Sequence, residues 1–231
     1  MSESVRAVHV STQEGYARWA TTYDQEDNAL IVLEEATVNL LLTQISYKRV
    51  LDVGTGTGRY ALKLAQRGAS ITALDQSPEM LAVARQAAQR QKLPIDFQLA
   101  PLDHTLPFVA AQFDLLVCAL TLCHVPDLTH TIAEFARVLQ PGGHLLITDF
   151  HPDSISYGWR TQFQQTGVKY LLPNMLHTRN TYLDALKMNG LTTLQAMDLP
   201  LQALPVGYFS EEFLRANGER FFCLVLLAQK V

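Results

Sequence analysis

The sequence predicts an α/β protein built around a doubly wound, mostly parallel sheet. Short apolar runs alternate with amphipathic segments throughout residues 49–150, and several of these runs end at a glycine or an aspartate. Of the 231 residues, 48% are apolar and 17% are charged, which allows a substantial core and argues against disorder. Because no repeat or low-complexity stretch divides the chain, we expect one domain over residues 1–231.

Residues 1–48 are expected to form an N-terminal helical cap. The stretch 18–45 places apolar side chains three and four positions apart, the spacing of an amphipathic helix. The stretch MSESVRAVHVSTQEGY lacks the apolar region of a signal peptide, and no apolar run approaches the roughly 18 residues of a membrane span. The three cysteines have apolar neighbours, which is typical of reduced thiols, so we expect a cytoplasmic protein.

The cofactor-binding core, residues 49–150, is predicted from its alternation of strands and helices. The expected strands are RVLDVG, SITALD, IDFQLA, FDLLVCAL and HLLITDF. The expected helices are RYALKLAQRG, which ends near Gly68, SPEMLAVARQAAQRQ, in which Ser77 is a good N-cap and Pro78 a good first residue, and DLTHTIAEFARVL.

After Phe150 this alternation stops. Residues 151–180 are aromatic and polar, with a turn-like Thr166-Gly167, so we expect an insertion that covers one end of the sheet. Residues 181–231 predict the helix TYLDALKMNG and the two strands LTTLQAMDLPL and RFFCLVLLAQKV. A hairpin of these strands would leave the last strand antiparallel in a mixed sheet.

Charge and cysteine spacing argue against two other kinds of site. The formal net charge is −4 and no block is rich in Lys or Arg, so nucleic acid as a main partner lacks its electrostatic footprint. The run CALTLCH, which holds Cys118 and Cys123, matches no common zinc spacing. We therefore expect core packing at these cysteines and no metal site.

The stretch RVLDVGTGTGRYALKLAQRGASITALD carries a candidate nucleotide site. Gly54, Gly56 and Gly58 occupy the first strand-to-helix turn, where bare backbone can approach a ligand and the helix N-terminus favours an anionic group. Asp75 ends the next strand, where an acid commonly accepts both ribose hydroxyls. We therefore expect a nucleoside with a compact polar tail. A nicotinamide dinucleotide would require glycine at Arg59, which disfavours the alternative of an NAD-dependent oxidoreductase.

Four motifs in order resemble those of one enzyme family. VLDVGTGTGRYAL resembles the first motif of class I S-adenosylmethionine-dependent methyltransferases, and ALDQSPEMLAVAR resembles their second. LPFVAAQFDLLVCALTLCHVPD and EFARVLQPGGHLLITDFHP are similar to the later core of the small-molecule, UbiE-like (type 11) group. The resemblance implies S-adenosylmethionine as cofactor. It also implies a Rossmann-like, seven-stranded sheet of order 3-2-1-4-5-7-6 with strand 7 antiparallel.

The resemblance gives individual residues a role in holding the cofactor. Asp52 and the glycine loop match the part that holds the amino-acid tail, and Asp75 matches the acid on the ribose. Gln76 and Met80 match neighbours of the adenine and ribose. The complete set that it implies is Tyr16, Tyr23, Asp52, Gly54, Thr55, Gly56, Gly58, Asp75, Gln76, Met80, Asp103, Cys118, Ala119 and Leu120.

Two parts of this set have alternatives. Related chains usually carry the acid near the adenine at the position that Leu102 occupies here. Either the loop is one residue shorter, or Asp103 is a surface residue. Tyr16 and Tyr23 match a segment that often closes over the cofactor, and ordinary helix packing is their alternative.

Catalysis would require a nucleophile in line with the methyl carbon. A protonated oxygen, nitrogen or carbon nucleophile can also require a general base. His124 and His151 follow the fourth and fifth expected strands, at the sheet edge that carries the site, so both are candidate bases. At either position a purely structural histidine is the alternative.

The methyl acceptor is expected to be a small organic molecule. Tyr157 and Trp159 in the insertion, together with His177, are candidate substrate-binding residues, although they can equally pack the insertion onto the sheet. The chain lacks the Asn/Asp-Pro-Pro-aromatic tetrad with which related enzymes hold a planar amino group in DNA or protein. A protein that binds the cofactor without catalysis is the second alternative to a methyltransferase.

Overall fold

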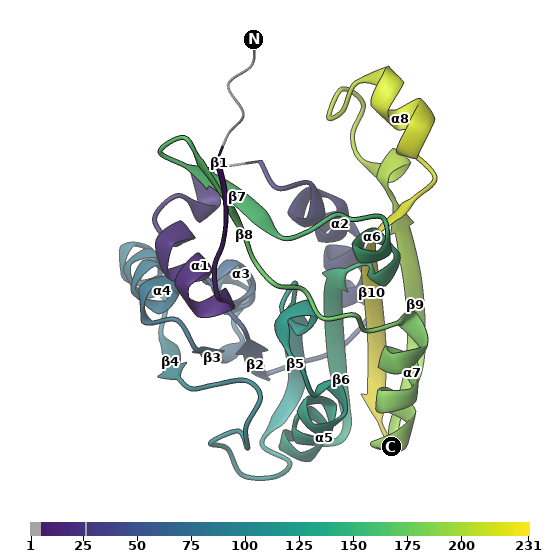
Figure 1. The fold of residues 1–231 in the computed structure, drawn as a ribbon. Helices are drawn as coiled ribbons and strands as arrows, with labels where there is room; N and C mark the ends of the chain where they lie inside the picture. The colour runs from purple at the N-terminus through teal and green to yellow at the C-terminus, as the bar shows by residue number, and fades with distance from the viewer. Residues whose placement is uncertain (1–5, 26) are drawn as a thin grey trace.

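The computed structural model describes residues 6–25 and 27–231, and its centre is a seven-stranded sheet (Figure 1). The order is β4-β3-β2-β5-β6-β10-β9; β10 is antiparallel to both neighbours, and the other pairs are parallel. This arrangement confirms the predicted order and the antiparallel last strand. The strands are β2 (Arg49–Val53), β3 (Ser70–Asp75), β4 (Ile95–Leu99), β5 (Phe113–Ala119), β6 (Leu139–Phe150), β9 (Leu191–Pro200) and β10 (Phe221–Lys230).

Helices cover both faces of this sheet. In β5, Leu116 and Cys118 pack into the apolar cluster on one face, whereas Leu115 and Val117 pack into the cluster on the other. Burial on both faces explains why the strands are continuous apolar runs. Within the described residues, no helix is long and apolar enough to cross a bilayer. The first face carries α5 (Leu128–Val138) and α7 (Arg179–Met188), and the second carries α2 (Ala29–Thr43), α3 (Arg59–Gln66) and α4 (Pro78–Gln91).

The helical stretch predicted for residues 18–45 is interrupted. The chain forms α1 (Thr12–Trp19), a short 3₁₀ turn (Tyr23–Gln25) and then α2. The side chain of Asn28 accepts a hydrogen bond from a backbone N–H in the first turn of α2 at 3.0 Å, which starts a new helix there.

A second, three-stranded sheet joins the N-terminal segment to the insertion. β1 (Arg6–His9) pairs in parallel with β8 (Val168–Leu171), and β7 (Gln162–Gln165) pairs antiparallel with β8. The turn between β7 and β8 holds Thr166 and Gly167, both with positive φ (48° and 75°), as a tight hairpin turn requires. The turn was expected from the sequence, whereas the pairing of these segments was not.

Residues 201–220 form a lobe between β9 and β10, where the sequence suggested a simple hairpin. The two strands pair antiparallel as expected, but the connecting chain leaves the sheet, forms α8 (Glu211–Asn217) and then returns. Phe209 and Phe213 pack there with ring centroids 4.7 Å apart, next to Tyr208. This segment, termed the aromatic lobe, projects beyond the sheet at the upper right of Figure 1.

The cysteines lie in the apolar interior. Cys118, Cys123 and Cys223 are all buried and form no disulfide. Burial raises the pKa of each thiol well above its usual value, so the thiols stay neutral at physiological pH. A reactive thiolate is therefore not favoured at any of the three positions.

Candidate functional site

A cavity opens at the carboxyl ends of β2, β3 and β5, with Thr12 and Tyr16 of α1 in its wall. Its volume is about 670 Å³ with the open mouth included. We term it the inner cavity. Its walls come from α1, the glycine loop, the β3–α4 turn and the segments after β4 and β5. The lining residues are Thr12, Tyr16, Tyr23, Gly54, Gly56, Asp75, Gln76, Met80, Leu102, Asp103, Ala119, Leu120, Thr121, His124, Val125 and Pro126.

The glycine loop leaves room for a ligand at one position only. A Cβ on Gly54 would lie 2.4 Å from Oγ1 of Thr121, and one on Gly58 would lie 3.1 Å from Cβ of Ala84. A Cβ on Gly56 would meet nothing within 4 Å. All three glycines have positive φ, so the loop conformation itself requires them. Gly54 and Gly58 therefore serve packing, while Gly56 presents bare backbone beside open space.

Asp75 connects the glycine loop to the end of β3. Its Oδ2 accepts a hydrogen bond from the backbone N–H of Gly56 and its Oδ1 accepts one from Ser77, both at 2.8 Å. Burial raises the pKa of this carboxyl, and the two backbone donors oppose the shift. Each carboxylate oxygen retains further acceptor capacity for a ligand hydroxyl.

A smaller compartment of about 340 Å³ lies behind the glycine loop and carries both signs of charge. Oδ2 of Asp52 accepts hydrogen bonds from the Thr55 hydroxyl (2.7 Å) and the Ala61 N–H (3.0 Å), and burial raises its pKa to about 6. Arg59 donates through Nη2 to the buried Glu34, but its buried Nη1 has no partner among the described residues. This tail compartment offers a carboxylate and a guanidinium N–H, the complement of an α-amino acid.

Tyr16 and His124 form a hydrogen-bonded pair in the wall of the inner cavity. The Tyr16 hydroxyl lies 3.0 Å from Nε2 of His124, and Nδ1 of His124 lies 2.7 Å from the carbonyl oxygen of Pro173. Because a carbonyl can only accept, Nδ1–H donates to it and Nε2 accepts from the tyrosine. Burial lowers the pKa of His124 and raises that of Tyr16 well above its usual value, so both side chains are neutral.

A second and larger cavity, of about 1280 Å³ with its open mouth included, lies on the far side of Tyr23. We term it the outer cavity. A narrow space, the neck, lies between the two cavities and shares Tyr16, Tyr23 and Leu120 with the inner one. The outer cavity is lined by Trp19, Tyr23, Asp27, Asn28, Ala29, Leu30, Phe150, Gly158, Trp159, Arg160, Thr161, Gln162, Leu201, Phe209, Phe213 and Phe222.

Comparison with known proteins identifies the family. A family model described as a methyltransferase domain matches residues 51–147. A demethylmenaquinone methyltransferase of Deinococcus radiodurans is 41% identical over 109 residues, which cover 46% of this chain and 45% of that protein. One of Tropheryma whipplei is 32% identical over 165 residues, 69% of this chain and 66% of that protein. The chain belongs to the class I S-adenosylmethionine-dependent methyltransferases.

Solved structures share the overall fold of this chain. An S-adenosylmethionine-dependent methyltransferase from Mesorhizobium loti superposes with a TM-score of 0.68 at 21% identity, over 88% of this chain and all (100%) of that one. Identity at this level shows the fold alone. The chain spans about half (45%) to about two thirds (66%) of the length of the two relatives described above.

Most residues expected to hold the cofactor lie around the two inner compartments of this methyltransferase-family chain. Asp103, which had two interpretations, lines the inner cavity beside Leu102, and its carboxylate lies 2.8 Å from Nδ1 of His104. Gly58 and Cys118 line neither compartment, because Gly58 begins α3 and Cys118 packs in the core. Those that line a compartment are Tyr16, Tyr23, Asp52, Gly54, Thr55, Gly56, Asp75, Gln76, Met80, Asp103, Ala119 and Leu120.

The two candidate bases, His124 and His151, lie in different surroundings. His124 lines the inner cavity, whereas His151 lines none of the cavities described above and begins α6 (Pro152–Ser156). Nε2 of His151 lies 3.1 Å from Oδ1 of Asp198, and its Nδ1 accepts the backbone N–H of Asp153 at 3.1 Å. Both ring nitrogens of His151 are therefore engaged in structural contacts.

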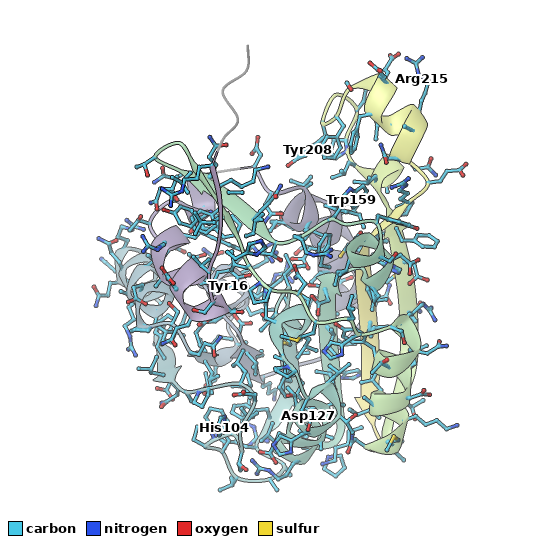
Figure 2. The ribbon with its side chains drawn as sticks, in the orientation of Figure 1. Tyr16, His104, Asp127, Trp159, Tyr208 and Arg215 are labelled. Atoms are coloured by element: carbon cyan, nitrogen blue, oxygen red, sulfur yellow. The ribbon has the colours of Figure 1, made fainter. Side chains whose placement is uncertain are left out.

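The three candidate residues for binding the methyl acceptor also lie in different surroundings. Trp159 lines the outer cavity, and Figure 2 shows it below the lobe that carries Tyr208. Tyr157 is 41% exposed and packs against Trp159, outside the lining of that cavity. His177 lies 2.7 Å from the carbonyl oxygen of Val125 through Nε2, and it lines none of these cavities.

Sequence reasoning missed some lining residues. Arg59 was considered only as the residue that replaces a third glycine, although it directly follows the loop and faces the tail compartment. Thr121 was also missed, and its side chain contacts the site of a Cβ on Gly54. The position of Arg59 next to the motif was a usable signal. For the aromatic lobe residues Phe209 and Phe213, no motif marked a role.

Proposed function

We propose that the protein transfers a methyl group from S-adenosylmethionine to a small organic molecule. One arrangement supports this most strongly: the inner cavity and the tail compartment share Gly54 and Gly56, with Asp75 on one side and Asp52 on the other. The bound cofactor would supply a methyl group on a sulfonium centre, which is a good leaving group. Relatives named for demethylmenaquinone methylation are consistent with a small acceptor.

The residues present fit the ribose and the amino-acid part of this cofactor. The Asp75 carboxylate would accept the ribose hydroxyls, and the bare backbone at Gly56 allows a ligand to approach closely. Asp52 would pair with the α-ammonium group, which would lower the raised pKa of Asp52 and ionise it. The free Nη1–H of Arg59 would donate to the α-carboxylate.

Tyr16 and His124 would remove the proton of the acceptor. Tyr16 lines both the inner cavity and the neck, so its hydroxyl oxygen is placed to take a proton from a nucleophile there. As it does so, its own proton passes to Nε2 of His124 over the 3.0 Å hydrogen bond. His124 becomes an imidazolium, which the Pro173 carbonyl stabilises through Nδ1–H. The phenol never needs to ionise, in agreement with its raised pKa.

Alignment of the reactants would contribute most of the rate. Holding a nucleophile in line with a methyl group at near-attack distance can lower the barrier by about 7–11 kcal/mol. Tyr23 lines the inner cavity, the neck and the outer cavity, so it lies where the two reactants would meet. Burial raises the pKa of Tyr23 to about 12, so it remains a neutral wall that excludes water.

Calorimetric titration with S-adenosylhomocysteine and, separately, with NAD tests the proposal. We expect saturable binding of the nucleoside thioether and none of NAD at equal concentration, because the glycine loop and tail compartment fit an amino acid rather than a pyrophosphate. Transfer of a tritiated methyl group from S-adenosylmethionine to a panel of hydroxylated aromatic compounds tests catalysis. Binding of NAD alone would reverse the assignment. Binding of the thioether without any transfer would favour a protein that holds the cofactor without catalysis.

A further inference from the structure

Residues 172–178, termed the strap, connect β8 to α7 without regular secondary structure (Figure 1). The strap forms hydrogen bonds to three successive residues at the end of the 3₁₀ turn that follows β5 (Leu122–His124). The three bonds, each 2.7 Å long, join the Met175 N–H to the Cys123 carbonyl, Nδ1 of His124 to the Pro173 carbonyl, and Nε2 of His177 to the Val125 carbonyl. These bonds fix the strap and the turn relative to each other, although neither belongs to a sheet.

The start of the strap also contacts the helix that carries Tyr16. Leu172 is buried in one apolar cluster with Tyr16 packed against it. A Cβ on Gly15, the residue before Tyr16, would lie 2.7 Å from Cδ2 of Leu172, so the missing side chain lets Leu172 pack against the backbone of α1. Leu172 and the residue after it therefore contact the two segments that carry the hydrogen-bonded pair.

Asn174 fixes the course of the strap where the pairing of β7 with β8 ends. The Leu172 N–H still donates to the Thr161 carbonyl at 2.9 Å, but Pro173 has no N–H to offer a neighbouring segment. The Asn174 side chain takes over, because its Oδ1 accepts the Thr161 N–H and its Nδ2 donates to the Thr161 hydroxyl, both at 2.9 Å. The Pro173 carbonyl belongs to the peptide group directly before Asn174, so these two bonds restrict its orientation.

The orientation of the Pro173 carbonyl decides which nitrogen of His124 can accept a proton. A neutral imidazole carries one N–H, and the hydrogen bond at one nitrogen sets the state of the other. With its proton on Nδ1 and directed at Pro173, His124 presents a lone pair on Nε2 to the Tyr16 hydroxyl, 3.0 Å away. In the other tautomer Nε2 carries the proton and could not take one from Tyr16.

A purely structural role for Asn174 is the alternative, in which it only fastens the insertion. The hydrogen bonds of Met175 and His177 already hold the later part of the strap on the turn. Asn174 instead anchors the peptide group whose oxygen meets His124. Its loss should therefore change the state of His124, whereas a mere fastening would change only the stability of the fold.

We propose that Asn174 is a positioning residue for proton removal. Through Thr161 it holds the Pro173 carbonyl against Nδ1 of His124, and this contact keeps Nε2 free of a proton. Asn174 lines none of the cavities described above, so it acts only through these contacts. The role in proton removal rests on the proposed function, whereas the tautomer of His124 can be measured without any substrate.

Nitrogen-15 NMR of the full chain, labelled at histidine, reads the tautomer directly. The two ring nitrogens of a neutral histidine resonate far apart when one tautomer dominates and closer together when both are populated. The signals of His124 are assigned by their loss in His124→Ala, and spectra are recorded above the usual histidine pH range. We expect a protonated Nδ1 and an unprotonated Nε2 in the wild type. A protonated Nε2 there would overturn the proposal.

Asn174→Leu and Asn174→Asp form a matched pair. Leucine has a similar volume but removes both bonds to Thr161, whereas aspartate still accepts the Thr161 N–H and can accept from its hydroxyl. We expect Asn174→Leu to reduce the separation of the two His124 signals to about half, and Asn174→Asp to restore most of it. Asn180→Leu, at an exposed position of α7, is the control and should leave the separation unchanged. An unchanged separation in Asn174→Leu would show a purely structural role.

Thr161→Val tests the same contact from the other side. It removes the hydroxyl partner and keeps the backbone N–H, so it should produce a smaller change of the His124 signals in the same direction. The double variant with Asn174→Leu should show no more than the effect of Asn174→Leu alone, because both changes break one contact. Additive effects would contradict the proposal. If Asn174→Leu does not fold, unchanged His124 signals in Thr161→Val would refute it.

Turnover distinguishes this inference from the proposed function. Methyl transfer by Asn174→Leu should fall about tenfold, with S-adenosylhomocysteine affinity within about twofold, since a misdirected proton acceptor slows only the chemical step. If the wild type held the expected tautomer but transferred no methyl group, the proposed function would fail while the positioning of His124 would stand. Normal transfer by Asn174→Leu despite a changed tautomer would overturn the role of Asn174 in proton removal.

Discussion

The inner and outer cavities lie side by side but are built in different ways. The inner cavity takes its central features from a short continuous stretch, the glycine loop and the aspartate at the end of the next strand. The outer cavity takes its walls from α1, the start of α2, the insertion, the aromatic lobe and β10. The inner cavity thus depends on local backbone geometry, whereas the outer cavity depends on long-range packing.

The largest expected effect is a loss of turnover on substitution of His124, which lines the inner cavity. His124→Ala should lower turnover by roughly 10²–10⁴-fold and leave S-adenosylhomocysteine affinity within threefold, because its role is proton removal. His130→Ala, an exposed histidine on α5, is the control. Since only neutral His124 accepts a proton and burial lowers its pKa, the rate should fall only as the pH drops below the usual histidine range. Equal losses of turnover and affinity would instead indicate misfolding.

Asp75→Ala should distinguish the roles of the inner and outer cavities most clearly. We expect about 100-fold weaker S-adenosylhomocysteine binding, because two ribose hydroxyls lose a shared charged acceptor. Calorimetry gives the affinity, and Asp96→Ala on β4, whose carboxylate accepts hydrogen bonds from the nearby Gln98 amide, is the control. Unchanged affinity would show that the ribose lies elsewhere.

The buried Asp149 of β6 should make the free energy of unfolding depend on pH. Burial raises its pKa from 3.8 to about 6, so between these values the folded chain holds a proton that the unfolded chain has released. The free energy of unfolding should therefore decrease as the pH rises through this window, by up to about 3 kcal/mol.

Asp149→Asn keeps a neutral side chain that can still bond the Tyr182 hydroxyl, now 2.7 Å from Oδ2. It should remove the contribution of this residue to the pH dependence, measured by denaturant unfolding from pH 4 to 7. Asp52, whose pKa is also raised to about 6, provides a remaining slope in the same variant. A variant with the full wild-type slope would place the titration elsewhere.

The smallest expected effect is a change in the free energy of unfolding on substitution of Asn28, which lines the outer cavity. Asn28→Ala removes the N-cap of α2 and should lower the free energy of unfolding by about 1 kcal/mol. Because Asn28 lines the outer cavity and the neck but not the inner one, S-adenosylhomocysteine affinity should not change. Thermal unfolding and calorimetry on the same sample check both statements. A loss of cofactor affinity would show that the two regions are more tightly coupled than their separate construction indicates.

The sequence signals for the inner region are local. Gly56 and Asp75 lie in adjacent strand-to-helix turns of a parallel sheet, and that topology brings them to one edge. The same topology placed His124 and His151 at one edge, yet only His124 reaches a cavity. The chain after β6 begins α6 at once and directs His151 toward Asp198, a strand away. No spacing rule reports such a contact in advance.

The outer region was harder to predict because each of its parts resembles ordinary packing. The break between α1 and α2 depends on a cap at Asn28 within an otherwise apolar periodic stretch. Phe209 and Phe213 lie on the segment between two strands for which the sequence predicted a hairpin and nothing more. Trp159 was a candidate from the sequence, but the residues beside it in the outer cavity are distant in sequence.

The pairing of β1 with β8 has a consequence for how the molecule assembles. Its register joins Arg6 to Val168, so this three-stranded sheet cannot form until most of the polypeptide has been synthesised. The N-terminal strand therefore gains its partner in this sheet only after β8 has left the ribosome.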